Sequence, residues 1–338
     1  MKASAAMIGS AVFYSFQYLD IQLQATTLSL SVWESSFYRG VSGAVVALLL
    51  HGICWCRRAA FWGKEKRALH TRGAIGGLSF LGTLVTLRHL SLPVATTVLS
   101  LSPFWTACCS PILFRRQSQT APRFTGGYER VGILLCVLGV VLLFVGSMSE
   151  KDASTISTLD LVVGLLAAMG STLCQSVVNM SISSVTLKDE PPFLLSLYPM
   201  VYTAIPGMVM MIVKSTGTTP LPPNLPLTWW LVARLSSTGV LAVGAQVLRV
   251  VALQNSSHVG ITIWRFLDVP LSLLLEHWVL RGSRSPSGQD MAGMLLITVG
   301  CMIPPACRFT TGQKTTDGEG PATCPAIPPP PGSETLAV

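Results

Sequence analysis

Apolar stretches of about 20 residues, separated by short polar segments, follow one another along nearly the whole chain. A helix needs about 20 mostly apolar residues to cross the hydrocarbon core of a bilayer. We expect about ten such helices, at residues 3–22, 32–55, 73–91, 93–114, 130–148, 158–183, 192–214, 228–253, 258–280 and 290–308. Strands of membrane barrels alternate apolar and polar positions, whereas these runs are continuous. The pattern therefore predicts an all-α, polytopic membrane helix bundle.

Charged residues are too few for a soluble protein of this length. They make up 11% of the 338 residues, whereas hydrophobic residues make up 50%. An ordinary soluble domain has about 25% charged residues, which it needs to cover its surface. The composition therefore argues against a soluble enzyme, a nucleic-acid-binding module and a disordered scaffold.

The orientation of the helices explains the net charge of +8. If ten spans start from a cytoplasmic N-terminus, most of the 23 Lys and Arg residues fall in cytoplasmic segments, above all in residues 57–72 and 115–130. This excess follows the positive-inside rule and predicts that both termini are cytoplasmic. The basic loop at 57–72 is also suited to anionic lipid headgroups. Gln17, Tyr18 and Asp20 interrupt the first apolar run, which favours an uncleaved first helix over a signal peptide.

Two segments about 165 residues apart show the same order of features. Leu87–Thr97 precedes Ser102-Pro103, and Leu253–Ile263 precedes Asp268–Pro270; a glycine-bearing span follows in each case. With five spans per half, an odd number, the second half must be inverted relative to the first. Inverted repeats are a recurrent transporter architecture, with the substrate site near the membrane midplane between the halves.

The order and spacing of several short motifs resemble a known family. The motifs are Trp33–Arg39, Arg72-Gly73, Leu92–Thr97, Ser102–Phe104, Ala252–Gln254 and Leu267–Val269. Together they resemble the drug/metabolite transporter superfamily of the EamA type, and most of all the G-type members of solute carrier family 35. The resemblance covers about residues 5–308 and implies a secondary transporter with two inverted five-helix halves. Such proteins often carry an acidic residue after the fourth span, where this chain has Arg115 and Arg116.

We accordingly divide the chain into two repeats and a tail. Residues 1–148 form the first EamA-like repeat and residues 149–308 the second. Residues 309–338 are expected to be a disordered, Pro-rich cytoplasmic tail. The tail ends in Leu336-Ala-Val338, which could bind a partner weakly through its terminal carboxylate. The alternative is a plain solvated tail.

Seven polar or charged residues inside the spans are candidate substrate-binding residues: Arg39, Gln175, Asn179, Gln246, Arg249, Arg265 and Asp268. A charge at the bilayer midplane costs several kcal/mol unless it is paired or hydrated, so it is a functional candidate by default. Three candidate pairs are spaced by three or four residues, and each pair therefore shares a helix face. The alternative for the polar residues is hydrogen bonding between helices.

Two of these candidates have specific alternatives. Arg265 and Asp268 could form an ion pair that substrate opens, or a permanent structural bridge. Arg39 could face the cavity and attract an anionic group, with Glu34 near the non-cytoplasmic mouth. Its alternatives are an interhelical pair or an orientation toward the lipid headgroups.

Arginines outnumber acids inside the spans, with Arg39, Arg234, Arg249 and Arg265 against Asp268 and Glu276. This surplus favours a small anionic solute such as a carboxylate or a phosphate ester, both of which Arg binds in bidentate fashion. The chain has no nucleotide-binding motif, and its nine Cys and five His residues show no metal-binding spacing. We therefore expect no cofactor, and transport driven by a gradient.

Two rival hypotheses use the same bundle: a non-transporting scaffold or regulator, and an integral membrane enzyme. We do not expect an enzyme, because no His, Asp and Glu constellation converges at one depth of the spans. The expected partners are the lipid bilayer, a small anionic solute, a second copy in a homodimer and a weak tail-binding protein, but no nucleic acid. The resemblance permits the plasma membrane, the endoplasmic reticulum or the Golgi.

Overall fold

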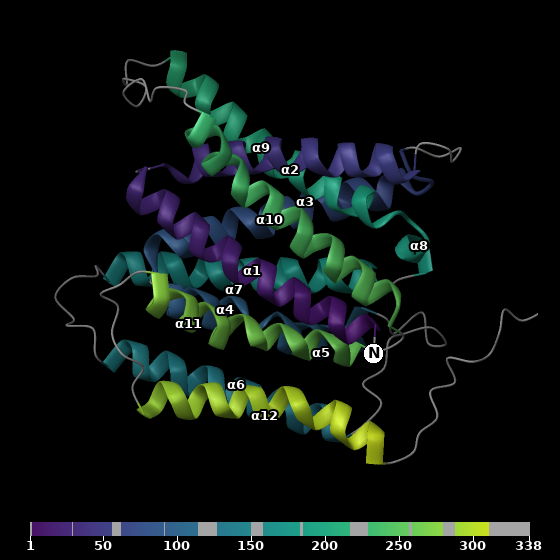
Figure 1. Cartoon of the computed structure of the whole chain (residues 1–338), viewed down its shortest axis with the longest axis vertical. Helices are drawn as coiled ribbons and strands as arrows, with labels where there is room; N and C mark the ends of the chain where they lie inside the picture. The colour runs from purple at the N-terminus through teal and green to yellow at the C-terminus, as the bar shows by residue number, and fades with distance from the viewer. Residues whose placement is uncertain are drawn as a thin grey trace, which may run out of the picture. The chain divides into compact units, whose positions relative to one another are not determined.

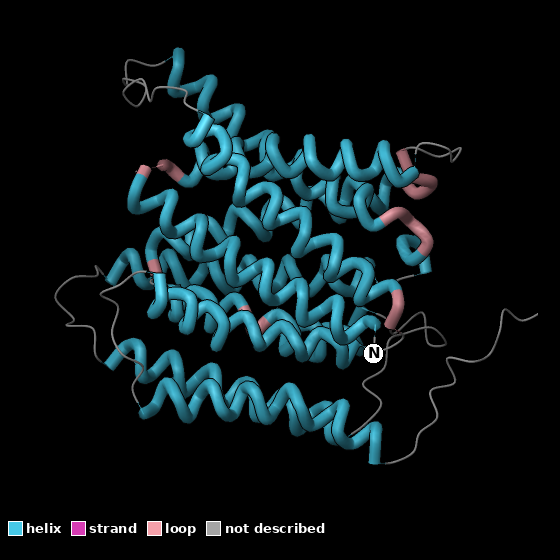
Figure 2. The backbone as a smooth tube through the Cα atoms, in the orientation of Figure 1, coloured by secondary structure: helices cyan, strands magenta, loops and turns pink. Residues whose placement is uncertain are grey.

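The structure, a computed structural model, describes residues 2–28, 30–55, 62–90, 92–113, 127–149, 158–182, 185–216, 229–256, 259–279 and 288–310. Every regular element in these ranges is helical (Figure 1, Figure 2). The elements are α1 (Lys2–Thr27), α2 (Val32–Trp55), α3 (Lys66–His89), α4 (Leu92–Leu99), α5 (Ser102–Leu113), α6 (Gly127–Ser149), α7 (Thr158–Ile182), α8 (Val185–Lys188), α9 (Pro192–Thr216), α10 (Trp229–Gln254), η1 (Val259–Leu267), α11 (Asp268–Val279) and α12 (Gly288–Thr310). The predicted all-α class is confirmed.

The chain divides into two units after Pro304. The first unit, Met1–Pro304, holds the helix bundle, and the second, Pro305–Val338, includes the end of α12. The tail predicted at 309–338 lies outside the described residues from residue 311 onward. All seven candidate substrate-binding residues lie in the first unit.

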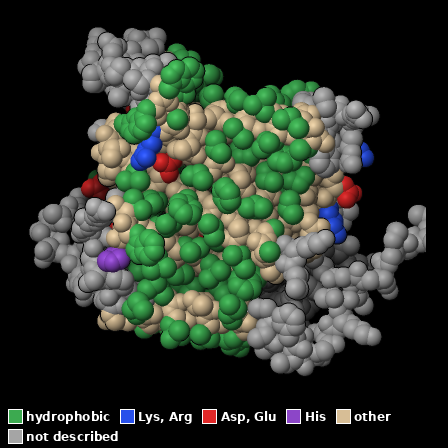
Figure 3. Space-filling model, in the orientation of Figure 1, with side chains coloured by type: hydrophobic (Ala, Val, Ile, Leu, Met, Phe, Trp, Pro, Cys, Tyr) green, Lys and Arg blue, Asp and Glu red, His purple; other side chains and the backbone are tan. Residues whose placement is uncertain are grey.

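Four of the described helices are long and apolar enough to cross a membrane: Val32–Cys54, Leu159–Ile182, Pro192–Val213 and Val232–Gln254. They carry large apolar side chains on their outer faces, and Leu49, Leu166 and Val213 are each more than half exposed. Apolar side chains cover most of the described surface in Figure 3. A soluble monomer rarely exposes so wide an apolar surface, so the bundle has the character of a membrane protein.

The fourth predicted span, 93–114, is not one continuous helix. It is divided into α4 and α5, with a turn at Ser100 and Leu101 between them. Pro103 explains the break, because in a continuous helix its missing N–H could not donate to the carbonyl of Leu99 and its ring would clash with that carbonyl. Ser102 begins α5, and Pro103 follows in the first turn, where a missing N–H costs little.

The ninth predicted span, 258–280, is interrupted in the same way. Its first part, η1, is a 3₁₀ helix, and its second part is α11, which begins at Asp268. Pro270 falls in the first turn of α11, where its missing N–H is tolerated. The carboxylate of Asp268 lies at the N-terminus of α11, where the helix dipole favours negative charge. In both spans, a polar residue followed closely by proline starts a new helix.

The third span begins earlier than the predicted residue 73. Because α3 starts at Lys66, Arg72 lies inside a helix and not in the cytoplasmic loop to which its charge assigned it. Leu69, Arg72 and Gly73 follow helical spacing, and all three are buried. The charge of Arg72 interrupts the apolar run, so the span predicted from apolar residues starts after the first turns of the helix.

Glycine residues let helices from the two halves of the chain touch backbone to backbone. α2 packs along α9, α1 along α10 and α3 along α7. A Cβ on Gly40 of α2 would lie 2.5 Å from the amide nitrogen of Ala204. A Cβ on Gly207 of α9 would lie 2.7 Å from the amide nitrogen of Phe37. Approach this close between helices is typical of packing in lipid, where small residues form the interfaces.

α6 and α12 form a second glycine-mediated contact and lie side by side in Figure 1. A Cβ on Gly139 would lie 2.7 Å from the carbonyl oxygen of Gly293, and one on Gly300 would lie 2.7 Å from the carbonyl oxygen of Gly132. A buried apolar cluster connects these two helices with η1 and α11; it consists of Ile133, Cys136, Val140, Ile263, Phe266, Val269, Ile297 and Cys301.

Candidate functional site

Four buried arginines define the candidate site, each from a different helix. Arg39 of α2, Arg72 of α3, Arg249 of α10 and Arg265 of η1 are at most 3% exposed. Burying a charged group costs several kcal/mol unless its partners compensate. The partners of each arginine therefore decide what the site can bind.

Arg249 is surrounded by neutral oxygen atoms. It donates hydrogen bonds to Oδ1 of Asn179 and, at 3.5 Å, to the hydroxyl of Tyr14. When the Gln175 amide is turned so that its oxygen faces the guanidinium, it accepts two further hydrogen bonds from Arg249. The structure thus brings together three of the predicted site residues, from α7 and α10. None of these hydrogen-bond partners carries charge.

Arg265 and Asp268 form a buried ion pair at the junction of η1 and α11. Nη2 of Arg265 lies 3.5 Å from Oδ2 of Asp268. Nη1 of Arg265 donates a hydrogen bond at 3.2 Å to Oγ of Ser102, the first residue of α5. Cζ of Arg265 also lies 5.0 Å from the ring centroid of Tyr14, within cation–π range. The two interrupted helices therefore meet at this ion pair.

Arg39 has no carboxylate partner in the part of the chain that the structure describes. With the Gln17 amide turned toward it, Nε and Nη2 of Arg39 each donate to the amide oxygen at 3.1 Å. Its guanidinium lies over the ring of Phe80. Glu34 instead accepts a hydrogen bond from the backbone N–H of Ser31 at 2.7 Å, as the glutamate of a capping box does. Its contacts are those of a helix cap at the start of α2.

Arg72 belongs to the candidate site, although the charge pattern assigned it to a loop. It donates to the backbone carbonyl of Leu195 and lines a small cavity together with Gln175, Gln246 and Arg249. The cavity has a volume of about 10 Å³, which is room for about one water molecule. The cavity beside Arg72 and Arg249 is therefore too small for a solute larger than water.

α1 supplies the centre of the site, which our sequence interpretation missed. Tyr14, Gln17 and Tyr18 are buried and follow the i, i+3, i+4 spacing of one helix face. Tyr14 contacts both Arg249 and Arg265, and Gln17 contacts the arginine of α2. The same spacing is the signal in the sequence that could have identified this face as polar and buried.

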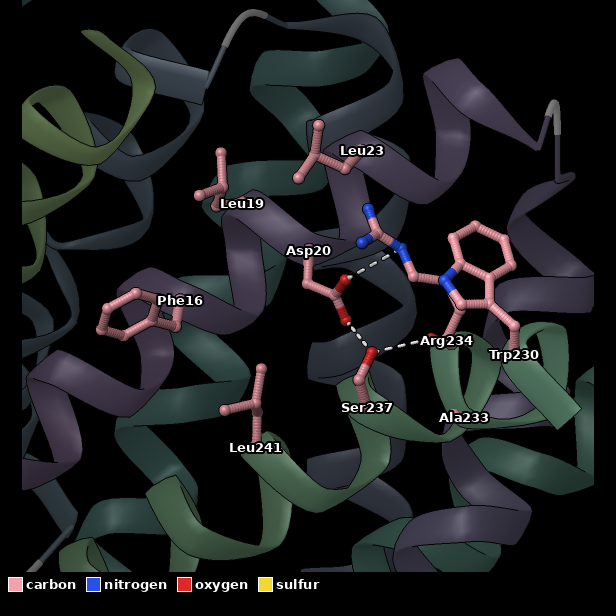
Figure 4. Close-up of a pocket in the computed structure, with 9 residues that line it drawn as sticks. All are labelled: Phe16, Leu19, Asp20, Leu23, Trp230, Ala233, Arg234, Ser237 and Leu241. Atoms are coloured by element: carbon pink, nitrogen blue, oxygen red, sulfur yellow. Dashed lines mark hydrogen bonds and ion pairs between the residues drawn. The ribbon is translucent and has the colours of Figure 1, made fainter. Parts of the chain in front are cut away.

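Arg234 does not belong to the central site. Its Nε lies 3.7 Å from Oδ1 of Asp20, so that the two form an ion pair between α10 and α1. Ser237 donates a hydrogen bond to the other carboxylate oxygen of Asp20. The three residues line a separate pocket of about 410 Å³ (Figure 4). The pairing removes Arg234 from the charge surplus predicted for the interior.

The centre of the bundle is nevertheless strongly positive. Arg72 joins Arg39, Arg249 and Arg265, and among the described residues Asp268 is the acidic side chain with which these arginines form an ion pair. Guanidinium groups with neutral partners retain the capacity to bind a carboxylate or a phosphate. No group of three or more His, Cys, Asp or Glu residues in the described ranges could hold a metal ion.

Comparison with known proteins supports the fold alone. No protein-family model matches the chain, and no curated protein matches it. A solved structure described as "Crystal structure of protein" aligns with a TM-score of 0.64 and 16% sequence identity, over 92% of this chain and 99% of that chain. At this identity the match identifies a shared helical fold and no activity, substrate or partner.

Proposed function

We propose that the chain is a secondary transporter of a small organic anion and belongs to the EamA-type drug/metabolite transporters that its motifs resemble. The observation that carries the proposal is the meeting of two interrupted helices at Arg265, Asp268 and Ser102. In secondary transporters, substrate sites form where discontinuous helices from two repeats meet near the midplane. A bundle that served only as a scaffold would gain stability from apolar residues at this point.

The contact between α2 and α9 supports two inverted repeats. Gly40 precedes Gly207 by 167 residues, and Phe37 precedes Ala204 by the same 167. The contact of Gly40 with Ala204 is therefore the counterpart of the contact of Gly207 with Phe37. Reciprocal contacts of this kind are what a two-fold axis between two equivalent helices produces.

The contact between α6 and α12 has the same reciprocity. Gly132 precedes Gly293 by 161 residues, and Gly139 precedes Gly300 by 161. Gly139 meets the carbonyl of Gly293, and Gly300 meets the carbonyl of Gly132, at the same 2.7 Å. Two independent helix pairs thus support one relation between residues 1–148 and 149–308.

We infer ten membrane-spanning segments with both termini cytoplasmic, and this arrangement can be tested by labelling. Inversion places the start of α3 and the start of its counterpart α10 on opposite faces of the membrane. The test uses full-length, cysteine-free protein in sealed vesicles and a membrane-impermeant maleimide. Lys64→Cys should react only from the cytoplasmic side, and Trp229→Cys only from the other side. If both positions react from one side, the halves are not inverted.

The electrostatics of the site support an anionic solute. The contacts described for Arg39 and Arg249 are with neutral groups, so a carboxylate or phosphate would supply a charged hydrogen-bond partner. Because the cavity beside Arg72 and Arg249 holds about one water molecule, entry of a solute there requires the helices around it to move. The turn at Leu101 and the junction at Asp268 are places where α5 and α11 can change direction without breaking further helix hydrogen bonds.

Uptake of labelled carboxylates and phosphate esters into proteoliposomes tests transport directly. We expect saturable uptake of at least one such anion by the full-length protein. Arg249→Gln should lower that uptake about tenfold, because a charge-assisted hydrogen bond contributes about 1.5–3 kcal/mol. Arg130→Gln removes an exposed arginine of α6 and serves as the control with unchanged uptake. Folded protein without any anion flux would favour the scaffold hypothesis, and unchanged flux in both Arg249→Gln and Asp268→Asn would place the site elsewhere.

The sequence and the resemblance suggest further parts of this proposal. We expect the chain to reside in the plasma membrane or in the endoplasmic reticulum or Golgi membrane, and to act without a cofactor or catalytic activity. A homodimer and a weak partner for the Pro-rich tail belong to the same proposal. Crosslinking in native membranes, followed by separation under denaturing conditions, tests the homodimer.

A further inference from the structure

A second pocket opens on the side of the bundle between α1 and α10. Its volume is about 410 Å³, and ligand pockets usually measure about 300–1,000 Å³. Its walls are mostly apolar and include Phe16 and Leu23 of α1 and Trp230 of α10. Figure 4 shows these side chains arranged around one charged pair, Asp20 and Arg234. The pocket therefore combines a wide apolar surface with one positive and one negative group.

The hydrogen bonding of the charged pair is incomplete on the arginine side. The 3.7 Å between Nε of Arg234 and Oδ1 of Asp20 is too long for a hydrogen bond. Within the described part of the chain, the Arg234 guanidinium makes no hydrogen bond, and its Nε is buried. Asp20, by contrast, accepts hydrogen bonds from Ser237 and, at 3.3 Å, from Gln24. Arg234 thus has donors available for an acceptor that enters the pocket.

In the ten-span arrangement proposed above, on which this step rests, the pocket lies at the depth where lipid headgroups meet acyl chains. α1 and α10 have 26 residues each, or about 39 Å, close to the thickness of a bilayer with its headgroups. Asp20 lies seven residues from the end of α1 and Arg234 five residues from the start of α10, which is about 8–10 Å along each helix. Trp230 is 67% exposed one turn closer to the helix end, where aromatic side chains of membrane proteins contact the interface.

We propose that this pocket binds a zwitterionic phospholipid, one whose headgroup carries a phosphate and an ammonium group. The phosphate accepts hydrogen bonds from the guanidinium of Arg234. The ammonium group lies between the carboxylate of Asp20 and the indole of Trp230, which attract it by charge and by cation–π interaction. The acyl chains follow the apolar wall that Phe16 and Leu23 form.

Charge complementarity distinguishes this lipid from the other possible occupants. An anionic phospholipid such as phosphatidylglycerol has no ammonium group to match Asp20, which would then face a negative headgroup. A neutral diacylglycerol has no phosphate for Arg234. A water-soluble phosphate monoester has no acyl chains to cover the apolar walls of Phe16 and Leu23. The lipid would contact α1 and α10 together and so connect the first half of the chain to the second.

Native mass spectrometry of the full-length protein in detergent tests the proposal without any measurement of transport. The lipids offered are dioleoyl phosphatidylcholine, dioleoyl phosphatidylglycerol and dioleoylglycerol, and free phosphocholine is the soluble competitor. We expect one tightly retained phosphatidylcholine, and about tenfold less retention for Arg234→Gln, which removes one charged donor. Asp20→Asn should keep the phosphate contact but lose most of the preference for phosphatidylcholine over phosphatidylglycerol. Arg130→Gln, an exposed arginine on α6, should behave as the unsubstituted protein.

Several outcomes would overturn the proposal. One is equal retention of phosphatidylcholine and phosphatidylglycerol by the unsubstituted protein, and another is full retention by Arg234→Gln. Displacement of the lipid by millimolar phosphocholine would identify a soluble ligand in its place. Loss of lipid on dimerisation would identify a second copy of the chain as the occupant. Thermal unfolding of each variant without lipid shows whether it is folded, so a misfolded Arg234→Gln is recognised and Asp20→Asn then decides.

Discussion

Replacing Arg39 by Met separates a functional role of this buried charge from a structural one. Met is unbranched and uncharged, so Arg39→Met keeps the apolar stem of the side chain and removes the guanidinium. Arg39 is 2% exposed, and its contacts are the amide oxygen of Gln17 and the ring of Phe80. If Arg39 only holds helices together, its removal should lower the free energy of unfolding substantially. If its role is to bind an anion, its removal should change the free energy of unfolding little.

The opposing contributions to folding are of similar size. Losing the charge-assisted hydrogen bonds to Gln17 costs about 1.5–3 kcal/mol, and losing the cation–π contact with Phe80 about 1–2 kcal/mol. Removing a buried charge that has no charged partner also removes its desolvation penalty, and this stabilises the folded state by several kcal/mol. We therefore expect the free energy of unfolding to change by less than about 2 kcal/mol, or to rise.

Two assays on the same preparation check this expectation. Tryptophan fluorescence during thermal unfolding in detergent should give a Tm within about 6 °C of the unsubstituted protein. Anion uptake into proteoliposomes, expressed per folded protein, should fall at least about tenfold. Gln17→Leu added to Arg39→Met removes the amide left without its partner, so the double variant should be at least as stable as the single one.

A specific combination of results would refute this reasoning. If Arg39→Met loses more than about 4 kcal/mol of stability while uptake per folded protein is unchanged, the role of Arg39 is to stabilise the packing of α1, α2 and α3. The neutral partners observed around it would then be sufficient for its charge.

Two further substitutions test the central ion pair and the helix contacts. Asp268→Asn should lower the free energy of unfolding by about 3–5 kcal/mol because Arg265 is left buried without a carboxylate, whereas replacing both residues by apolar ones should regain most of it. Equal losses in the single and double variants, measured by denaturant titration in detergent, would contradict a coupled pair. Gly139→Ala should destabilise the protein by about 1–3 kcal/mol, since the new methyl group would lie 2.7 Å from the carbonyl of Gly293. Gly52→Ala, with nothing within 4 Å, is the control and should stabilise it by about 0.5–1 kcal/mol; indistinguishable effects would argue against the packing of α6 on α12.

The positions of most helices could be predicted because the signal is local. The predicted span 32–55 coincides with α2, and the predicted spans 158–183 and 192–214 differ from α7 and α9 by at most two residues at each end. A run of apolar residues long enough to cross a bilayer does not depend on its neighbours for recognition. The two interrupted spans also had a local signal in Pro103 and Pro270, which a search for apolar length alone does not detect.

The candidate residues were partly predictable, for a related reason. A charge inside an apolar run is costly wherever it lies, so Arg39, Arg249 and Arg265 could be identified from the sequence alone. Arg72 did not, because it lies near the end of a helix, where a charge is ordinary in sequence. Tyr14 did not, because a tyrosine is uncharged, and only its spacing with Gln17 and Tyr18 indicates a polar helix face.

Sequence alone thus determined that the chain is an apolar helical bundle and that its interior carries surplus positive charge, because both follow from residue type and local spacing. The tertiary structure decided which charges share a site. Arg249 meets Asn179, 70 residues away, and Tyr14, 235 residues away. Arg234 pairs instead with Asp20 in a lateral pocket. Such partnerships depend on how whole helices pack, and packing of glycine against backbone is specified jointly by residues far apart in the chain.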